Sequence, residues 1–208
     1  MPSPQRAILR ITSEGGIRLS EVREYLAAIE DAYNGTLVFE NFIDGLRRHD
    51  PFFFHPPSFM WWPLRASGRK RTLKLGGGTE SIASFVPPPE RVVLLRVKLE
   101  SPGAWEFLGR LNPLEVIRQW IADGHERRKD KNYREAAEQE RLRLENSLLE
   151  NRVIHERIQI ARELGATDED LAPVLNELIF KPLNGVSQQQ NKGLIQNAEL
   201  DNLDEQHK

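Results

Sequence analysis

The chain has 208 residues, 39% of them hydrophobic, and a formal net charge of −2. That length can bury the core of one domain with an extension or of two small domains. The absence of cysteine excludes disulfides, thiolate nucleophiles and cysteine zinc sites. The chain also lacks the apolar run of a signal peptide or a spanning helix. We therefore expect a cytoplasmic protein with no transmembrane segment, no metal and no other cofactor, and we expect no contact with a membrane surface.

The N-terminal elements are predicted from periodicity and from start and stop residues. Residues 7–12 contain alternating apolar positions, which indicates a strand. Ser20 is a suitable N-cap for a helix whose apolar residues follow at helical spacing, and Asn34-Gly35 is a typical stop. Residues 37–46 then predict a second helix that packs against the first.

The next segment, 49–89, is rich in proline and contains a triple glycine, so it cannot be mainly helical. Short strands are expected at 72–75 and 81–86. Residues 91–100, RVVLLRVKLE, form the strongest predicted strand of the chain. Because this strand is apolar on both faces at its start, we expect it at the centre of the sheet.

One long helix is predicted from the N-cap Asn112 to Leu164, followed by Gly165 as its stop. A shorter helix is predicted from the N-cap Thr167 to Pro182. The remaining tail is polar, and we expect it to be disordered.

The expected fold class is therefore α+β, with a small mixed domain followed by a long helix and a coiled-coil-like C-terminal helical hairpin. The expected units are residues 1–111, 112–185 and 186–208.

Apolar residues near the end of the predicted long helix form two neighbouring seams. The C-terminal helix can cover one seam, which leaves the other free for a second copy of the chain. This arrangement favours a non-enzymatic oligomerising scaffold or adaptor, with itself or another protein as partner. The residues assigned to oligomerisation are Leu142, Leu144, Leu148, Leu149, Val153, Ile158, Ile160 and Leu164.

A second candidate surface lies in the basic, aromatic segment 47–74. Phosphates attract cations and unstacked bases pack on aromatic rings, so this composition suits nucleic acid and gives the alternative function. The favoured interpretation of this segment, however, is that its aromatic residues belong to a core with the arginines exposed around them, and contact with a membrane or a protein is a further alternative. The residues assigned to an anionic partner are Arg47, Arg48, Arg65, Arg69, Lys70, Arg71, Lys74, Trp61 and Trp62.

The sequence contains no recognisable catalytic motif. His49, Asp50 and His55 lack a known metal-ligand spacing, and LGGGTES at 75–81 lacks the lysine of a phosphate-binding P-loop. Neither a G-x-S-x-G elbow nor an H-E-x-x-H helix is present. The charged run HERRKDKNYRE at 125–135 is interpreted as a solvated part of the helix. An enzyme with a site assembled from scattered residues is the third hypothesis.

The stretch VKLESPGAWEFLGRLNPLEVIRQWI, with the charged run that follows, resembles a loosely defined set of uncharacterised bacterial proteins. Those proteins pair a small α/β region with an S-P-G turn and a long charged helix. The resemblance covers residues 91–183 and implies a bacterial origin and this architecture. It also implies an accessory role in a multi-protein system, such as one for defence, but it assigns no catalytic residue.

Overall fold

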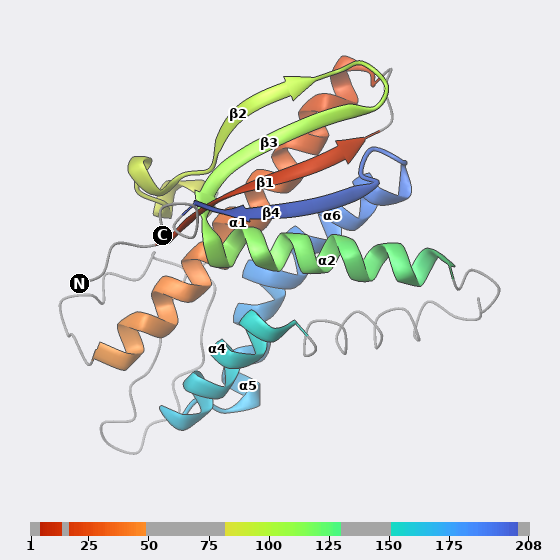
Figure 1. The fold of residues 1–208 in the computed structure, drawn as a ribbon. Coiled ribbons are helices and arrows are strands. Elements are labelled where there is room, and N and C mark those ends of the chain that lie inside the picture. The colour runs from red at the N-terminus through yellow and green to blue at the C-terminus, as the bar shows by residue number, and fades with distance from the viewer. Residues whose placement is uncertain (1–4, 14–16, 49–81, 130–150, 204–208) are drawn as a thin grey trace.

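The computed structural model describes residues 5–13, 17–48, 82–129 and 151–203 (Figure 1). The fold is α+β, as predicted. Its antiparallel sheet has the strand order β2-β3-β1-β4. The strands are β1 (Arg6–Ser13), β2 (Val93–Lys98), β3 (Gly103–Arg110) and β4 (Asn197–Asn202).

Helices cover one face of this sheet (Figure 1). Burial alternates along β1 and β3, so each strand has a buried face beneath the helices and an open face toward solvent. The α-helices are α1 (Leu19–Arg48), α2 (Leu111–Lys129), α4 (Arg152–Glu163), α5 (Asp168–Leu175) and α6 (Lys181–Asn191). The shorter elements are the 3-10 turns η1 (Ile82–Phe85) and η2 (Pro88–Glu90) and the π-helical turn η3 (Asn176–Phe180).

Helix α1 forms the centre of the helical layer, and it continues through Asn34-Gly35, so the predicted stop there is wrong. Residues 32–40 are buried on every side of the helix. A Cβ at Gly35 would lie 2.0 Å from the carbonyl oxygen of Leu178 in η3. Glycine therefore serves here as a close-packing residue, and packing offsets its low helix propensity.

The predicted strands at 7–12 and 91–100 are both present, as β1 and β2, but the predicted central position of the second is wrong. Residues 93–98 form β2 at an edge of the sheet rather than at its centre. Residues 103–110, for which the sequence predicts no strand, form the interior strand β3. Residues 82–85 form a 3-10 turn instead of the predicted strand. The second expected strand, at 72–75, lies outside the described residues.

An unbroken helix from Asn112 to Leu164 is also wrong. The Asn151 side chain caps α4 by accepting the Ile154 amide, and its Nδ2 donates to the Val116 carbonyl oxygen at 3.4 Å. The start of α4 therefore lies beside the first turns of α2, a position that a straight helix cannot reach. The predicted helix stop at Gly165 and the predicted N-cap at Thr167 are confirmed. Gly165 has φ +91° just after α4, and Thr167 forms a capping box.

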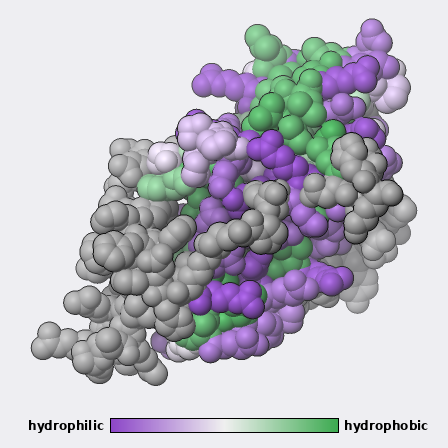
Figure 2. All heavy atoms as spheres, turned by 60° about the vertical axis from the view of Figure 1, so that its left-hand side comes forward, coloured by the Kyte–Doolittle hydropathy of each residue, from purple (hydrophilic) through white to green (hydrophobic). Residues whose placement is uncertain are grey.

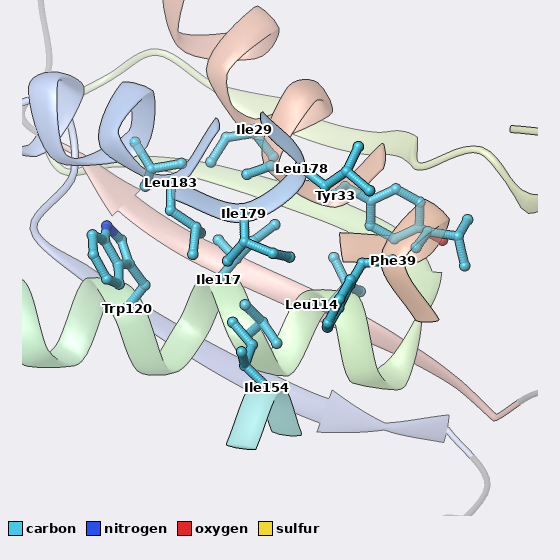
Figure 3. Packing of buried hydrophobic residues seen from close by; sticks show 14 of the residues in the cluster. Ile29, Tyr33, Phe39, Leu114, Ile117, Trp120, Ile154, Leu178, Ile179 and Leu183 are labelled. Atoms are coloured by element: carbon cyan, nitrogen blue, oxygen red, sulfur yellow. The ribbon is translucent and has the colours of Figure 1, made fainter. Parts of the chain in front are cut away.

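Contrary to expectation, the C-terminal segment is folded as far as the structure describes it, to residue 203. The chain passes Pro182 as helix α6, and β4 then pairs with β1 as the second edge of the sheet. Residues on both sides of the expected boundary at 111/112 share one hydrophobic core (Figure 3). That core includes Tyr33 of α1, Leu114 of α2, Ile154 of α4 and Leu183 of α6.

Candidate protein-interaction surface

The strand β2 carries the main exposed apolar patch in the described part of the chain. Figure 2 turns this side of the molecule toward the viewer and shows apolar atoms gathered among hydrophilic ones. We call residues Val93 to Leu99 the β2 edge. Its exposed large apolar side chains, with their exposed fractions, are Val93 (48%), Leu94 (41%), Leu95 (47%), Val97 (41%) and Leu99 (54%). Apolar groups gathered in this way are typical of a binding surface.

The pairing of β2 explains why both of its faces are exposed. Among the described residues β2 pairs with β3 alone, so no described strand lies beside its outer backbone groups. Leu94 and Val97 stand opposite residues of the buried face, yet the helical layer leaves both of them 41% exposed. Val93 stands opposite Leu108 on the open face. In the described part of the chain, the strand therefore presents outer backbone groups without a strand partner, with apolar side chains on both of its faces, which is a template for another strand.

A register shift between Leu94 and Arg96 marks a bulge at Leu95. One extra residue places Leu94 opposite Phe107 and Arg96 opposite Glu106, so the side-chain alternation changes phase at that point. Bulges and edge cations both hinder unselective pairing of edge strands. A strand that pairs with the β2 edge would therefore have to match this irregular alternation.

The start of β2 is held firmly to the core. The Tyr33 hydroxyl donates to the Glu90 carbonyl oxygen at 2.8 Å and accepts the Arg110 amide at 2.9 Å. Arg110 also forms an ion pair with the Glu90 carboxylate. These contacts join η2 to the end of β3 through a tyrosine that is fully buried. A partner strand would thus meet an edge that is already ordered, which lowers the entropic cost of binding.

Opposite charges flank the β2 edge. At its start, the Arg91 side chain donates to the carbonyl oxygens of Val86 at 3.2 Å and Ala83 at 3.4 Å. At its end, Glu100 has a side chain 83% exposed and lies 3.8 Å from Lys98. The strand itself carries the cations Arg96 and Lys98 and no acid.

The open face of the neighbouring strands is more polar than the β2 edge. Arg10 on β1 forms ion pairs with Glu106 of β3 at 3.3 Å and with Asp201 of β4 at 2.6 Å. On β4, Asn197 and Glu199 are exposed. The two edges of the sheet therefore differ in character, β2 being apolar and cationic and β4 polar and acidic.

The predicted oligomerisation residues divide into three groups. Leu142, Leu144, Leu148 and Leu149 lie outside the described residues. Ile158 is buried in the core, and Val153 and Ile160 are partly buried against it. Leu164 is 39% exposed at the end of α4. In the described part of the chain, this seam therefore packs largely within its own molecule, and one exposed member remains.

Most residues assigned to an anionic partner lie outside the described residues. Arg47 is exposed near the end of α1, and Arg48 is the last residue of that helix. The others, namely Trp61, Trp62, Arg65, Arg69, Lys70, Arg71 and Lys74, lie outside the described residues, as do His49, Asp50, His55 and the glycine loop at 75–81.

A buried polar cluster links α1 to α4. Glu40 is 4% exposed, and burial raises the pKa of its carboxyl against the opposing effect of Arg157 and of a hydrogen bond from Asn112. Arg157 donates to Glu40 at 3.4 Å and to Asp44 at 3.1 Å. Within the described ranges, no three acidic, histidine or cysteine side chains group as metal ligands would. The cluster thus holds α4 in place, a role that no sequence motif indicates.

No protein-family model matches the chain, and no curated protein or solved structure shows significant similarity to it. Among the helices that the structure describes, none combines the length and apolar character needed to cross a membrane.

Proposed function

We propose that this protein is a non-enzymatic oligomerising scaffold and that the β2 edge is the surface through which it associates. The observation that carries the proposal is the concentration of exposed apolar side chains on one ordered edge strand. Strand addition to such an edge supplies backbone hydrogen bonds and buries side chains on both faces.

The exposed side chains contribute enough free energy to be measured. Full burial of a Val or Leu side chain is worth about 1.5–3 kcal/mol, so each half-exposed residue of the β2 edge can contribute about 1 kcal/mol. The double variant Leu95→Lys with Val97→Lys removes two such contributions from every copy. In a dimer the loss is about 4 kcal/mol, which corresponds to a Kd roughly a thousandfold higher.

The test is light scattering after size exclusion over a concentration series. We expect the wild-type mass to approach a multiple of 24.0 kDa and the double variant to remain monomeric. Leu164→Lys is the matched control, because Leu164 has a similar exposed fraction, 39%, and belongs to the seam predicted from sequence. A monomeric wild type contradicts the proposal, and dissociation by Leu164→Lys alone assigns the interface to that seam instead.

A further inference from the structure

The side chains around β2 follow a twofold symmetry, in that residues at equal distances from its midpoint lie on the same face of the sheet. The sequence RVVLLRVKLE at 91–100 has its midpoint between Leu95 and Arg96. Leu94 and Val97 lie at equal distances from this midpoint, and register with β3 assigns both to the buried face. Val93 and Lys98 are likewise equidistant, and both belong to the open face.

This symmetry depends on the bulge. In a regular strand, residues three apart point to opposite faces. The extra residue at Leu95 shifts the alternation, so that Leu94 and Val97 share a face. The strand therefore matches a copy of itself running in the opposite direction, because each side chain then stands opposite one on the same face.

From these features we infer that the partner of the β2 edge is the β2 edge of a second copy, paired antiparallel about a twofold axis between Leu95 and Arg96. This inference rests on the proposed function. In this register Leu94 stands opposite the partner's Val97, and continued alternation places Val92 opposite the partner's Leu99. These are apolar pairs on the face that the helices cover only in part.

Charge is complementary in the same register. Arg91, two residues before the β2 edge, comes opposite the partner's Glu100, one residue after it, and the twofold axis repeats this pair. Arg96 stands opposite the partner's Leu95, and Lys98 stands opposite the partner's Val93. The two Arg96 side chains flank the axis on the open face, about one residue apart along the strands, so the charge complementarity of this register lies at its two ends. A twofold interface requires this reciprocity, in which residue i meets j and residue j meets i.

Pairing β2 with the β4 edge of another copy is the competing arrangement. It would set the apolar side chains of β2 beside Asn197 and Glu199, which are exposed on β4. It would also be head to tail, and such contacts form rings or open filaments rather than a closed dimer. The twofold pairing stops at two copies and joins their sheets into one.

Cysteine cross-linking tests the register, because the chain has no cysteine of its own. The single variants Leu94→Cys and Val97→Cys are made, and each is oxidised alone and as an equimolar mixture. The mixture should give a disulfide-linked dimer on a non-reducing gel. Each variant alone should give little, since two copies of one position lie about 10 Å apart along the strands, beyond the reach of a disulfide.

A charge exchange gives an independent measurement. Glu100→Arg alone should weaken the dimer about 3-fold to 30-fold, because two opposite-charge pairs become like-charge pairs. The double variant Arg91→Glu with Glu100→Arg should restore most of the affinity.

The outcomes separate this inference from the proposed function. A dimeric wild type whose mixed variants fail to cross-link, or whose Leu94→Cys variant links to itself, overturns the register. A mass that grows beyond two copies with concentration supports pairing with β4 and also overturns it. A wild type that is monomeric throughout overturns the proposed function as well.

Discussion

The two buried tyrosines of α1 provide a matched test of how the β2 edge is held. Tyr33 and Tyr25 are both fully buried beneath the sheet. The Tyr33 hydroxyl makes the two hydrogen bonds to Glu90 and Arg110, whereas the Tyr25 hydroxyl is buried without a partner. The substitution Tyr→Phe removes the same atom at both positions, but its effect on the free energy of unfolding should differ in sign between them.

Tyr33→Phe leaves a backbone amide and a backbone carbonyl without their partner. A fully buried group left unsatisfied costs about 1–3 kcal/mol. Both of these hydrogen bonds are only partly buried, so we expect the two losses together to lower the free energy of unfolding by about 2–4 kcal/mol. For a chain of this size, that loss lowers Tm by roughly 4–16 °C. Tyr25→Phe instead removes a hydroxyl whose burial is uncompensated, so stability should be unchanged or higher by up to about 1 kcal/mol.

Urea unfolding followed by tryptophan fluorescence measures both variants under one condition, and circular dichroism checks that the helices remain. Equal losses in the two variants, or a loss confined to Tyr25→Phe, would refute the assignment of Tyr33 as the anchor of the β2 edge. If the anchor matters for association, Tyr33→Phe should also weaken the dimer at concentrations where the monomer is folded.

Two further pairs of variants test the helical layer by urea unfolding. Gly35→Ala should lower the free energy of unfolding by several kcal/mol, because the added Cβ would lie 2.0 Å from the Leu178 carbonyl oxygen. Gly185→Ala makes an ordinary 3.5 Å contact and should raise the free energy of unfolding by up to about 1 kcal/mol. Similar effects of the two substitutions would contradict the close-packing role of Gly35. Burial raises the pKa of the Glu40 carboxyl above its usual 4.5. The contribution of Glu40 to stability is therefore present below pH 4.5 and is lost as the pH rises through the raised pKa. Glu40→Gln should remove this pH dependence. Burial also acts to raise the pKa of Glu115, but hydrogen bonds from neighbouring side chains hold that pKa below its usual value. The contribution of Glu115 to the free energy of unfolding is therefore lost as pH falls. Glu115→Gln should accordingly change the acid side of the stability–pH profile. Identical pH profiles for wild type and Glu40→Gln would refute the first assignment.

The local signals in the sequence determined local structure correctly. The alternating apolar residues of 7–12 form β1, Gly165 ends α4, and Thr167 begins α5 with a capping box. Each of these features depends on hydrogen bonds and backbone angles within a few residues, so a short stretch of sequence specifies it.

The tertiary structure decided the features that depend on distant partners. Asn34-Gly35 has the composition of a helix stop, yet the backbone of η3 packs against Gly35 and α1 continues. Asn151 begins α4 beside α2, and the polar tail provides β4 because β1 offers a free edge to pair with.

The same distinction separates the predicted interaction site from the one proposed here. The apolar run at 91–100 correctly predicted a strand, but whether that strand is central or at an edge depends on what lies beside it. Residues 103–110 occupy the interior position, between β2 and β1. The sequence by itself determined that this strand is apolar on both faces at its start. Only the tertiary structure decided that, among the described strands, it has a single neighbour, because strand order is set by packing between segments far apart in the chain.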